Sequence, residues 1–149
     1  MTTLFTKNEL GDIAKKILEK VSFLASSRAD VVTLSGDLGA GKTTLSQHVA
    51  KELGVVENVI SPTFVIMKSY EIKNKNYKWK NLVHIDAYRL TKSEELLKLG
   101  WEKILSDQNN LILIEWSELV PECIPDGGVC RVNLNHVDEE RREIEFKII

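Results

Sequence analysis

The sequence predicts an α/β fold with three layers, α/β/α, around a mixed central sheet that carries antiparallel hairpins. A buried strand at residues 31–34 and a helix at residues 45–53 are joined by a glycine-rich loop. A continuous apolar run at residues 111–114 is typical of a parallel strand that is buried on both faces. Residues 64–72 and 77–86 are rich in β-branched and aromatic side chains and flank a polar turn, which predicts an antiparallel hairpin.

Length and composition set the class of protein. The 149 residues suit one domain, spanning residues 1–149. A net charge of −2 argues against a protein whose main surface binds nucleic acid. The sequence shows neither an apolar signal region nor a membrane-length apolar run, so we expect a cytoplasmic protein. Cys123 and Cys130 lack the spacing of a zinc site and are expected to be free thiols.

Two helices flank this central part of the sequence. Thr6 and Glu9 match a capping box and are followed by apolar residues at helical spacing, which predicts a helix over about residues 7–25. A second helix is predicted at about residues 94–105, with a break near Gly100.

The last third of the chain ends in a second hairpin. Prolines and glycines predict a loop over residues 119–128. Two alternating segments, residues 129–135 and 143–149, predict the hairpin strands, which are joined by a charged turn.

The glycine-rich loop fits the phosphate-loop pattern G-x-x-x-x-G-K-[ST]. Its residues are Gly36, Asp37, Leu38, Gly39, Ala40, Gly41, Lys42, Thr43 and Thr44. Such a loop aims backbone N–H groups and a helix N-terminus at bound phosphates. Lys42 would reach the β- and γ-phosphates, and the Thr43 hydroxyl would hold Mg²⁺. The order strand, loop, helix supports this interpretation and predicts a P-loop NTPase fold that binds ATP and Mg²⁺.

Two carboxylates follow predicted strands, at the edge where open α/β sheets bind ligands. Asp86 ends one strand and suits a role in orienting Mg²⁺ or the attacking water. The alternative is that Asp86 caps a helix or shapes a turn. Glu115 ends the buried strand, where a carboxylate needs a partner such as Mg²⁺, unless it simply emerges into solvent.

Three further side chains have two interpretations each. His84 shares a strand face with Asp86, and packing is slightly favoured over a role as partner to the site. Trp116 could lie over a nucleotide, although filling the core is the commoner use of tryptophan. Thr63 follows Pro62 in a stiff loop and is either a switch-like residue near the γ-phosphate or an ordinary loop residue.

Four blocks in this order resemble the TsaE (YjeE) family from end to end. They are the phosphate loop, Ser61-Pro62-Thr63-Phe64, the stretch HIDAYRL at residues 84–90, and Glu115-Trp116. The phosphate loop alone is unspecific, but the four blocks together are highly specific in so short a chain. The resemblance implies a small P-loop ATPase that is needed to make threonylcarbamoyladenosine in tRNA.

The resemblance also implies roles for individual residues. Thr43 and Glu115 would hold Mg²⁺, and Asp86 would lie beside the metal and the γ-phosphate. Asp86 and Thr63 would serve hydrolysis, which gives a catalytic set of Lys42, Thr63 and Asp86.

Two more residues and the partners follow from the same resemblance. Trp116 would lie beside the nucleotide. Arg141 would correspond to the arginine of a Gly-Arg pair between the last two strands. The family works with two proteins, TsaB and TsaD, so this chain would interact with tRNA only indirectly, through that complex. No membrane would be involved. The ATPase activity would support turnover of the complex.

A free-standing small-molecule kinase is the alternative function. A kinase also needs an acceptor clamp and usually an arginine-bearing lid, whereas Arg89 is the one arginine in the central region. A GTPase switch is less suitable still, because Arg89 stands where D-x-x-G needs glycine and the guanine-reading N-K-x-D is absent. The sequence therefore favours ATP.

Overall fold

The computed structural model describes residues 2–24, 27–36, 41–60 and 65–149. These residues form a seven-stranded mixed sheet in the order β1-β7-β6-β2-β5-β4-β3. The strands are β1 (Thr2–Thr6), β2 (Asp30–Gly36), β3 (Met67–Glu71), β4 (Asn81–Asp86), β5 (Asn110–Glu115), β6 (Val129–His136) and β7 (Arg141–Ile148). The central strands β6, β2, β5 and β4 are parallel, and β1, β7 and β3 pair antiparallel at the two sides.

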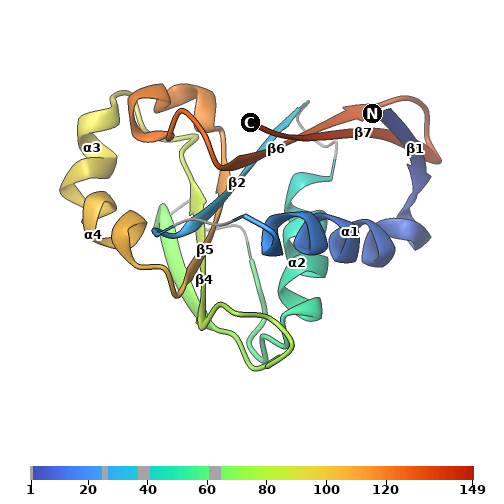
Figure 1. Cartoon of the computed structure of the whole chain (residues 1–149). Coiled ribbons are helices and arrows are strands. Elements are labelled where there is room, and N and C mark those ends of the chain that lie inside the picture. The colour runs from blue at the N-terminus through green and yellow to red at the C-terminus, as the bar shows by residue number, and fades with distance from the viewer. Residues whose placement is uncertain (1, 25–26, 37–40, 61–64) are drawn as a thin grey trace.

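Helices cover both faces of this sheet. They are α1 (Leu10–Ser22), α2 (Lys42–Glu52), α3 (Ser93–Lys98) and α4 (Trp101–Ser106), with 3₁₀ turns η1 (Lys7–Glu9), η2 (Ser117–Leu119) and η3 (Pro121–Cys123). Figure 1 shows α1 and α2 on one side of the central strands and α3 and α4 on the other. The three-layer α/β/α architecture with a mixed sheet and two antiparallel hairpins, predicted from the sequence, is therefore confirmed.

Each face of the sheet has its own apolar cluster. On β5, Leu111 and Leu113 join the cluster beneath α1 and α2, whereas Ile112 and Ile114 join the cluster beneath α3 and α4. Successive side chains of a strand point to opposite faces. A strand with helices on both sides must therefore be apolar throughout, which is why this run does not alternate.

The N-terminal region differs from the prediction in two ways. The first helix begins at Leu10 and ends at Ser22, because residues Lys7–Glu9 form a 3₁₀ turn. The Thr6 amide still donates to the Glu9 carboxylate at 3.1 Å, as the capping box requires. The strand β1 was not predicted. It is a five-residue edge strand whose position depends on pairing with β7 at the far end of the chain.

The remaining elements follow the prediction with small shifts at their ends. Gly100 has φ 89° and separates α3 from α4, so the expected break is present. The segment between β5 and β6, which includes the loop predicted over residues 119–128, contains two 3₁₀ turns, η2 and η3.

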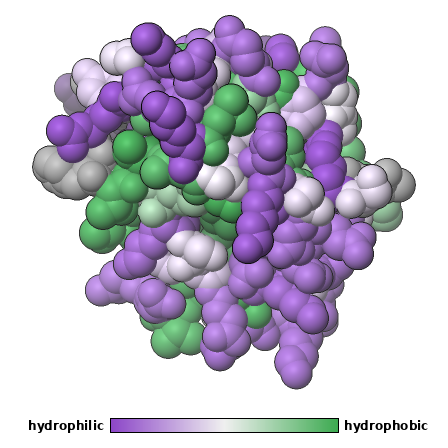
Figure 2. Space-filling view, turned by 90° about the vertical axis from the view of Figure 1, so that its left-hand side faces the viewer, coloured by the Kyte–Doolittle hydropathy of each residue, from purple (hydrophilic) through white to green (hydrophobic). Residues whose placement is uncertain are grey.

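The outer face over α3 and α4 is mostly hydrophilic, with a group of hydrophobic side chains reaching the surface among them (Figure 2). Among the described residues, no helix is long and apolar enough to cross a membrane. Cys123 and Cys130 are free and buried, as expected. Burial raises the pKa of the Cys130 thiol to about 11.

Candidate functional site

Three parallel strands bring their carboxyl ends together at one edge of the sheet. The β4–β5 register sets Asp86 opposite Glu115, and the β2–β5 register sets Leu34 opposite Glu115. Gly36, at the end of β2, therefore begins the phosphate loop next to the end of β5, and the end of β4 follows on the other side of β5. The two acids that the sequence places after separate strands are neighbours in the fold.

Backbone geometry supports the two glycines at the ends of the phosphate-loop pattern. Gly36 has φ 135°, and a Cβ there would lie 1.8 Å from the Leu134 carbonyl oxygen on β6. Gly41 has φ 106° and immediately precedes α2. Only glycine adopts such torsions readily, so the loop can turn tightly between β2 and α2. The predicted nucleotide contacts Asp37, Leu38, Gly39 and Ala40 lie outside the described residues.

Lys42 is the first residue of α2, and its side chain is buried between the phosphate loop and Trp116. It is 7% exposed, and its Nζ donates to the Gly36 carbonyl oxygen at 2.8 Å. The same Nζ lies 4.4 Å from the centre of the Trp116 ring. A cation over an indole face is a favourable arrangement, which holds the ammonium at the mouth of the loop.

Trp116 is therefore part of the site, although its ring also contacts the apolar cluster beneath α3 and α4. Its backbone has φ 61°, and its ring centre lies 5.0 Å from that of Tyr88. A positive φ is unusual for a bulky residue and costs on the order of 1–3 kcal/mol. This strained turn directs the indole toward Lys42. The sequence favoured a role for Trp116 in the core, and the structure shows that it contacts both the core and the site.

Asp86 is 4% exposed, and its Oδ1 accepts a hydrogen bond of 3.0 Å from the Tyr88 amide. The turn role that the sequence left open is therefore present. It does not exclude a second role, because a carboxylate can accept several hydrogen bonds or bind a metal at the same time. Involvement of Asp86 with Mg²⁺ or water stays a prediction.

Glu115 is buried and paired. Its Oε2 lies 2.7 Å from His84 Nε2, and the two residues are 3% and 0% exposed. An ionised carboxylate only accepts hydrogen bonds, so with Glu115 ionised the His84 Nε2–H is the donor of this bond. The alternative that Glu115 emerges into solvent is wrong. The slight preference for His84 as a packing residue was incomplete, because His84 is buried and also contacts Glu115.

The other predicted residues are placed as follows. Thr43 is half-buried in the first turn of α2, next to Lys42, and Thr44 is exposed. Arg141 is exposed at the start of β7, where Asp138 accepts from its side chain at 2.8 Å. The strand β6 lies between β7 and β2, and the β6–β7 turn that carries Arg141 is at the same edge of the sheet as the end of β2. Contact between Arg141 and a nucleotide stays a prediction. Thr63 lies outside the described residues.

Among the described residues, no group of three or more His, Cys, Asp or Glu side chains could hold a metal ion. Mg²⁺ at nucleotide sites is commonly held by one or two carboxylates together with phosphate oxygens and water. Thr43, Asp86 and Glu115 provide hard oxygen donors of that kind. The donor set is therefore compatible with Mg²⁺ bound together with a nucleotide.

Comparison with known proteins gives one consistent family. The family model described as "Threonylcarbamoyl adenosine biosynthesis protein TsaE" matches residues 5–144. The chain is 36% identical to the Rickettsia typhi tRNA threonylcarbamoyladenosine biosynthesis protein TsaE over 148 residues, covering 99% of this chain and 94% of the relative. Its identity to the Bacillus subtilis protein of that name is 34% over 134 residues, or 90% and 79% of the two chains.

A solved structure agrees with these relatives. The fold is similar to the crystal structure of Bacillus subtilis YdiB, with a TM-score of 0.73 and 29% sequence identity. The match covers 100% of this chain and 85% of that one.

Proposed function

The chain belongs to the TsaE family, and on this premise we propose that it binds and hydrolyses ATP with Mg²⁺ in the threonylcarbamoyladenosine modification of tRNA. The relatives' names support the pathway.

One observation carries the proposal. Asp86 ends β4, Glu115 and Trp116 stand at the end of β5, and Lys42 begins the helix that follows β2. The fold brings these strand ends to one edge of the sheet, where the Lys42 ammonium lies over the Trp116 ring. Two acids, a lysine and an aromatic ring beside a glycine-rich turn suit a magnesium nucleotide. A structural role alone does not explain why an ammonium and two carboxylates are buried at the same edge.

The residues fit a bound triphosphate. The N-terminus of α2 directs unpaired backbone N–H groups and its positive dipole end toward the loop, where an anion is stabilised. Lys42 has three donors, and only one is used by the Gly36 carbonyl oxygen. The ammonium can therefore bind phosphate oxygens from where it already lies, close to the loop.

The residues also fit the metal. The Thr43 hydroxyl and the carboxylates of Asp86 and Glu115 would hold Mg²⁺, which when bound neutralises charge on the phosphate oxygens. His84 holds the Glu115 carboxylate in one orientation through its Nε2–H. The Asp86 carboxylate orients the attacking water, and the Trp116 ring excludes solvent beside Lys42.

The partners proposed for this activity are TsaB and TsaD. Hydrolysis supports turnover of that complex in the cytoplasm. This protein contacts tRNA only indirectly, through the complex.

The test uses cells depleted of this protein. Bulk tRNA is digested and threonylcarbamoyladenosine is quantified by mass spectrometry, with rescue by the wild type, Lys42→Ala or Lys51→Ala. Lys51 is an exposed lysine near the end of α2, so it controls for loss of charge on the same helix. We expect rescue by the wild type and Lys51→Ala only. Rescue by Lys42→Ala would contradict the role of the phosphate loop, and an unchanged nucleoside level on depletion would contradict the pathway.

A further inference from the structure

The turn that follows β4 contacts the end of β5 at the candidate site. The Ala87 amide in this turn donates to the Glu115 carbonyl oxygen at 3.0 Å. The Tyr88 amide donates to Asp86 Oδ1 at 3.0 Å. The Tyr88 ring lies against that of Trp116, with the ring centres 5.0 Å apart and the planes at 52°. Two consecutive residues therefore connect this turn to β5 and to the residue after it, one through its backbone and one through its ring.

Burial does not explain the position of Tyr88. The residue is 57% exposed, so most of its ring lies outside the core, whereas Trp116 is half-buried. Two aromatic rings at this separation and tilt attract each other beyond the area that they bury. The contact therefore affects the orientation of the indole more than it affects the packing of the core.

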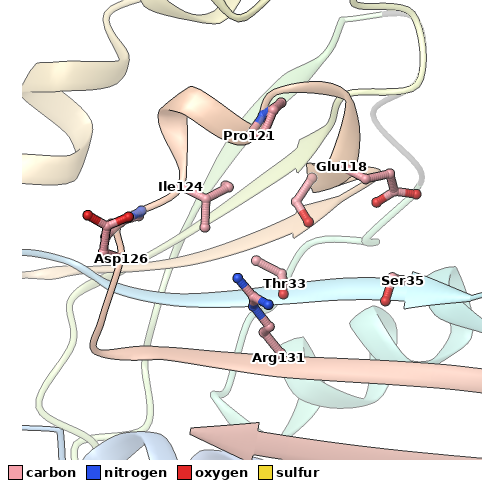
Figure 3. Close-up of a pocket in the computed structure, with 9 residues that line it drawn as sticks. Thr33, Ser35, Glu118, Pro121, Ile124, Asp126 and Arg131 are labelled. Carbon is pink, nitrogen blue, oxygen red and sulfur yellow. The ribbon is translucent and has the colours of Figure 1, made fainter. Parts of the chain in front are cut away.

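Trp116 needs such support, because its backbone has φ 61°. A bulky residue keeps that torsion only where its surroundings hold it. The segment after Trp116 borders a polar pocket of about 420 Å³, which Ser117 and Glu118 line (Figure 3). Figure 3 shows Glu118 on one wall and Thr33 on the strand across from it. An open space supplies no packing contacts, so the apolar cluster beneath α3 and α4 and the Tyr88 ring support the indole.

The Trp116 ring in turn contacts the ammonium of Lys42. Lys42 Nζ lies 4.4 Å from the ring centre and donates to the Gly36 carbonyl oxygen at 2.8 Å. A displaced indole would remove one of these two contacts, and the long lysine side chain could then adopt other rotamers. A charge that already lies in place costs less to order when a ligand binds. The orientation of Trp116 therefore bears on how well Lys42 can bind a phosphate.

We propose that Tyr88 is a positioning residue of this site. It connects the turn after β4 to the Trp116 indole and thereby sets where the Lys42 ammonium meets the phosphates. This inference rests on the proposed function, because it assigns a nucleotide to the ammonium. Tyr88 acts on the ammonium through Trp116 and contacts neither nucleotide nor metal. Since the ring makes the contact, phenylalanine should replace tyrosine at this position and alanine should not.

The first measurement uses the full chain without nucleotide, labelled with 5-fluorotryptophan. The chain has three tryptophans, and the ¹⁹F resonance of Trp116 is the one that is lost in Trp116→Phe. Tyr88→Ala should shift the Trp116 resonance and leave those of Trp79 and Trp101 in place, because both of these rings are buried elsewhere. Tyr88→Phe should keep the Trp116 resonance near its wild-type position.

The second measurement follows Lys42 itself, in the same nucleotide-free chain labelled with ¹³C-lysine. The face of an aromatic ring shifts nearby protons upfield, so the ε-protons of Lys42 should stand apart from those of the exposed lysines. Their signal is identified by its loss in Lys42→Arg. In Tyr88→Ala it should move toward the signals of the other lysines, and in Tyr88→Phe it should not.

The third measurement is the affinity for ATP with Mg²⁺, by calorimetry. Tyr88→Ala should weaken binding by about threefold to tenfold, which corresponds to the loss of a tilted aromatic pair. Tyr88→Phe should bind within about twofold of the wild type.

Tyr77→Ala is the matched control, because Tyr77 stacks on Trp79 with ring centres 5.9 Å apart, before the start of β4. It should move the Trp79 resonance and leave Trp116, the Lys42 signal and the ATP affinity unchanged. A thermal melt establishes that each variant is folded.

Three results would overturn the proposal. They are a folded Tyr88→Ala chain with wild-type Trp116 and Lys42 signals, a folded Tyr88→Ala chain with wild-type ATP affinity, and a Tyr88→Phe chain that behaves like Tyr88→Ala. A wild-type chain that does not bind ATP would instead contradict the proposed function. The two failures are distinguishable, because the ¹⁹F and lysine signals are recorded without nucleotide.

Discussion

His84 Nε2 lies 2.7 Å from Glu115 Oε2, and both side chains are buried between β4, β5 and the elements that cover them. His84 Nδ1 has no hydrogen-bond partner among the described residues. Within the described part of the chain, the bond to Glu115 is therefore the one polar contact that holds this ring, and it orients the carboxylate at the end of β5.

Removal of His84 should destabilise the fold strongly. His84→Ala leaves a buried carboxylate without its partner, which costs about 3–5 kcal/mol of unfolding free energy. His84→Gln keeps an N–H donor in a similar place and should lose less. Urea unfolding at pH 7 measures both. Lys73→Ala is the control, because it breaks an exposed pair with Glu71 of 2.9 Å and should cost at most about 1 kcal/mol. Equal losses for His84→Ala and Lys73→Ala would contradict a stabilising role for the buried pair.

Glu115→Gln separates charge from shape at the same position. The amide oxygen can still accept from His84 Nε2, so the fold should remain stable. If Glu115 holds the metal, the Mg²⁺ concentration for half-maximal ATP hydrolysis should rise by roughly tenfold or more. Calorimetry with ATP, with and without Mg²⁺, and hydrolysis assays with the partner proteins measure the two effects. An unchanged Mg²⁺ dependence would remove Glu115 from the metal site.

The sequence predicted where strands end along the chain better than it predicted which side chains contact one another in the site. The spacing of Asp86 and Glu115 after apolar runs was sufficient to place both at strand ends, because local hydrophobic pattern determines where a strand stops. The pairing of His84 with Glu115 could not be predicted, since it depends on β4 and β5 being neighbours in one register. The strand β1 was missed for the same reason, because its partner β7 is at the other end of the chain.

The position of the Trp116 ring could not be predicted from the sequence either. Its φ of 61° results from the turn after β5, and no residue type at this point signals it, since glycine or asparagine would be the usual choice.

Gly36→Ala should destabilise the protein, whereas Gly11→Ala should stabilise it. A Cβ at Gly36 would overlap the Leu134 carbonyl oxygen at 1.8 Å, and φ 135° is strained for alanine. We expect a loss of about 2 kcal/mol or more, because the backbone of β2 or β6 must move. A Cβ at Gly11, inside α1, would meet only His48 at 3.9 Å, and alanine gains roughly 0.5–1 kcal/mol in a helix. Urea unfolding of both variants tests the pair, and equal effects would contradict the close approach of β2 and β6.

Cys130 should make the unfolding free energy fall with rising pH. Burial raises the pKa of its thiol from 9.0 to about 11 in the folded chain. Above pH 9 the unfolded thiol ionises while the folded thiol keeps its proton, so the unfolded state is favoured progressively until the folded pKa is reached. The contribution is therefore fully present below pH 9 and is lost between pH 9 and about pH 11, by roughly 2–3 kcal/mol. Urea unfolding of the wild type and Cys130→Ala across this range isolates the effect, because the other titrating groups cancel in the difference. The difference between the two free energies should change with pH in favour of the variant. A constant difference would show that the thiol ionises alike in the folded and unfolded chains.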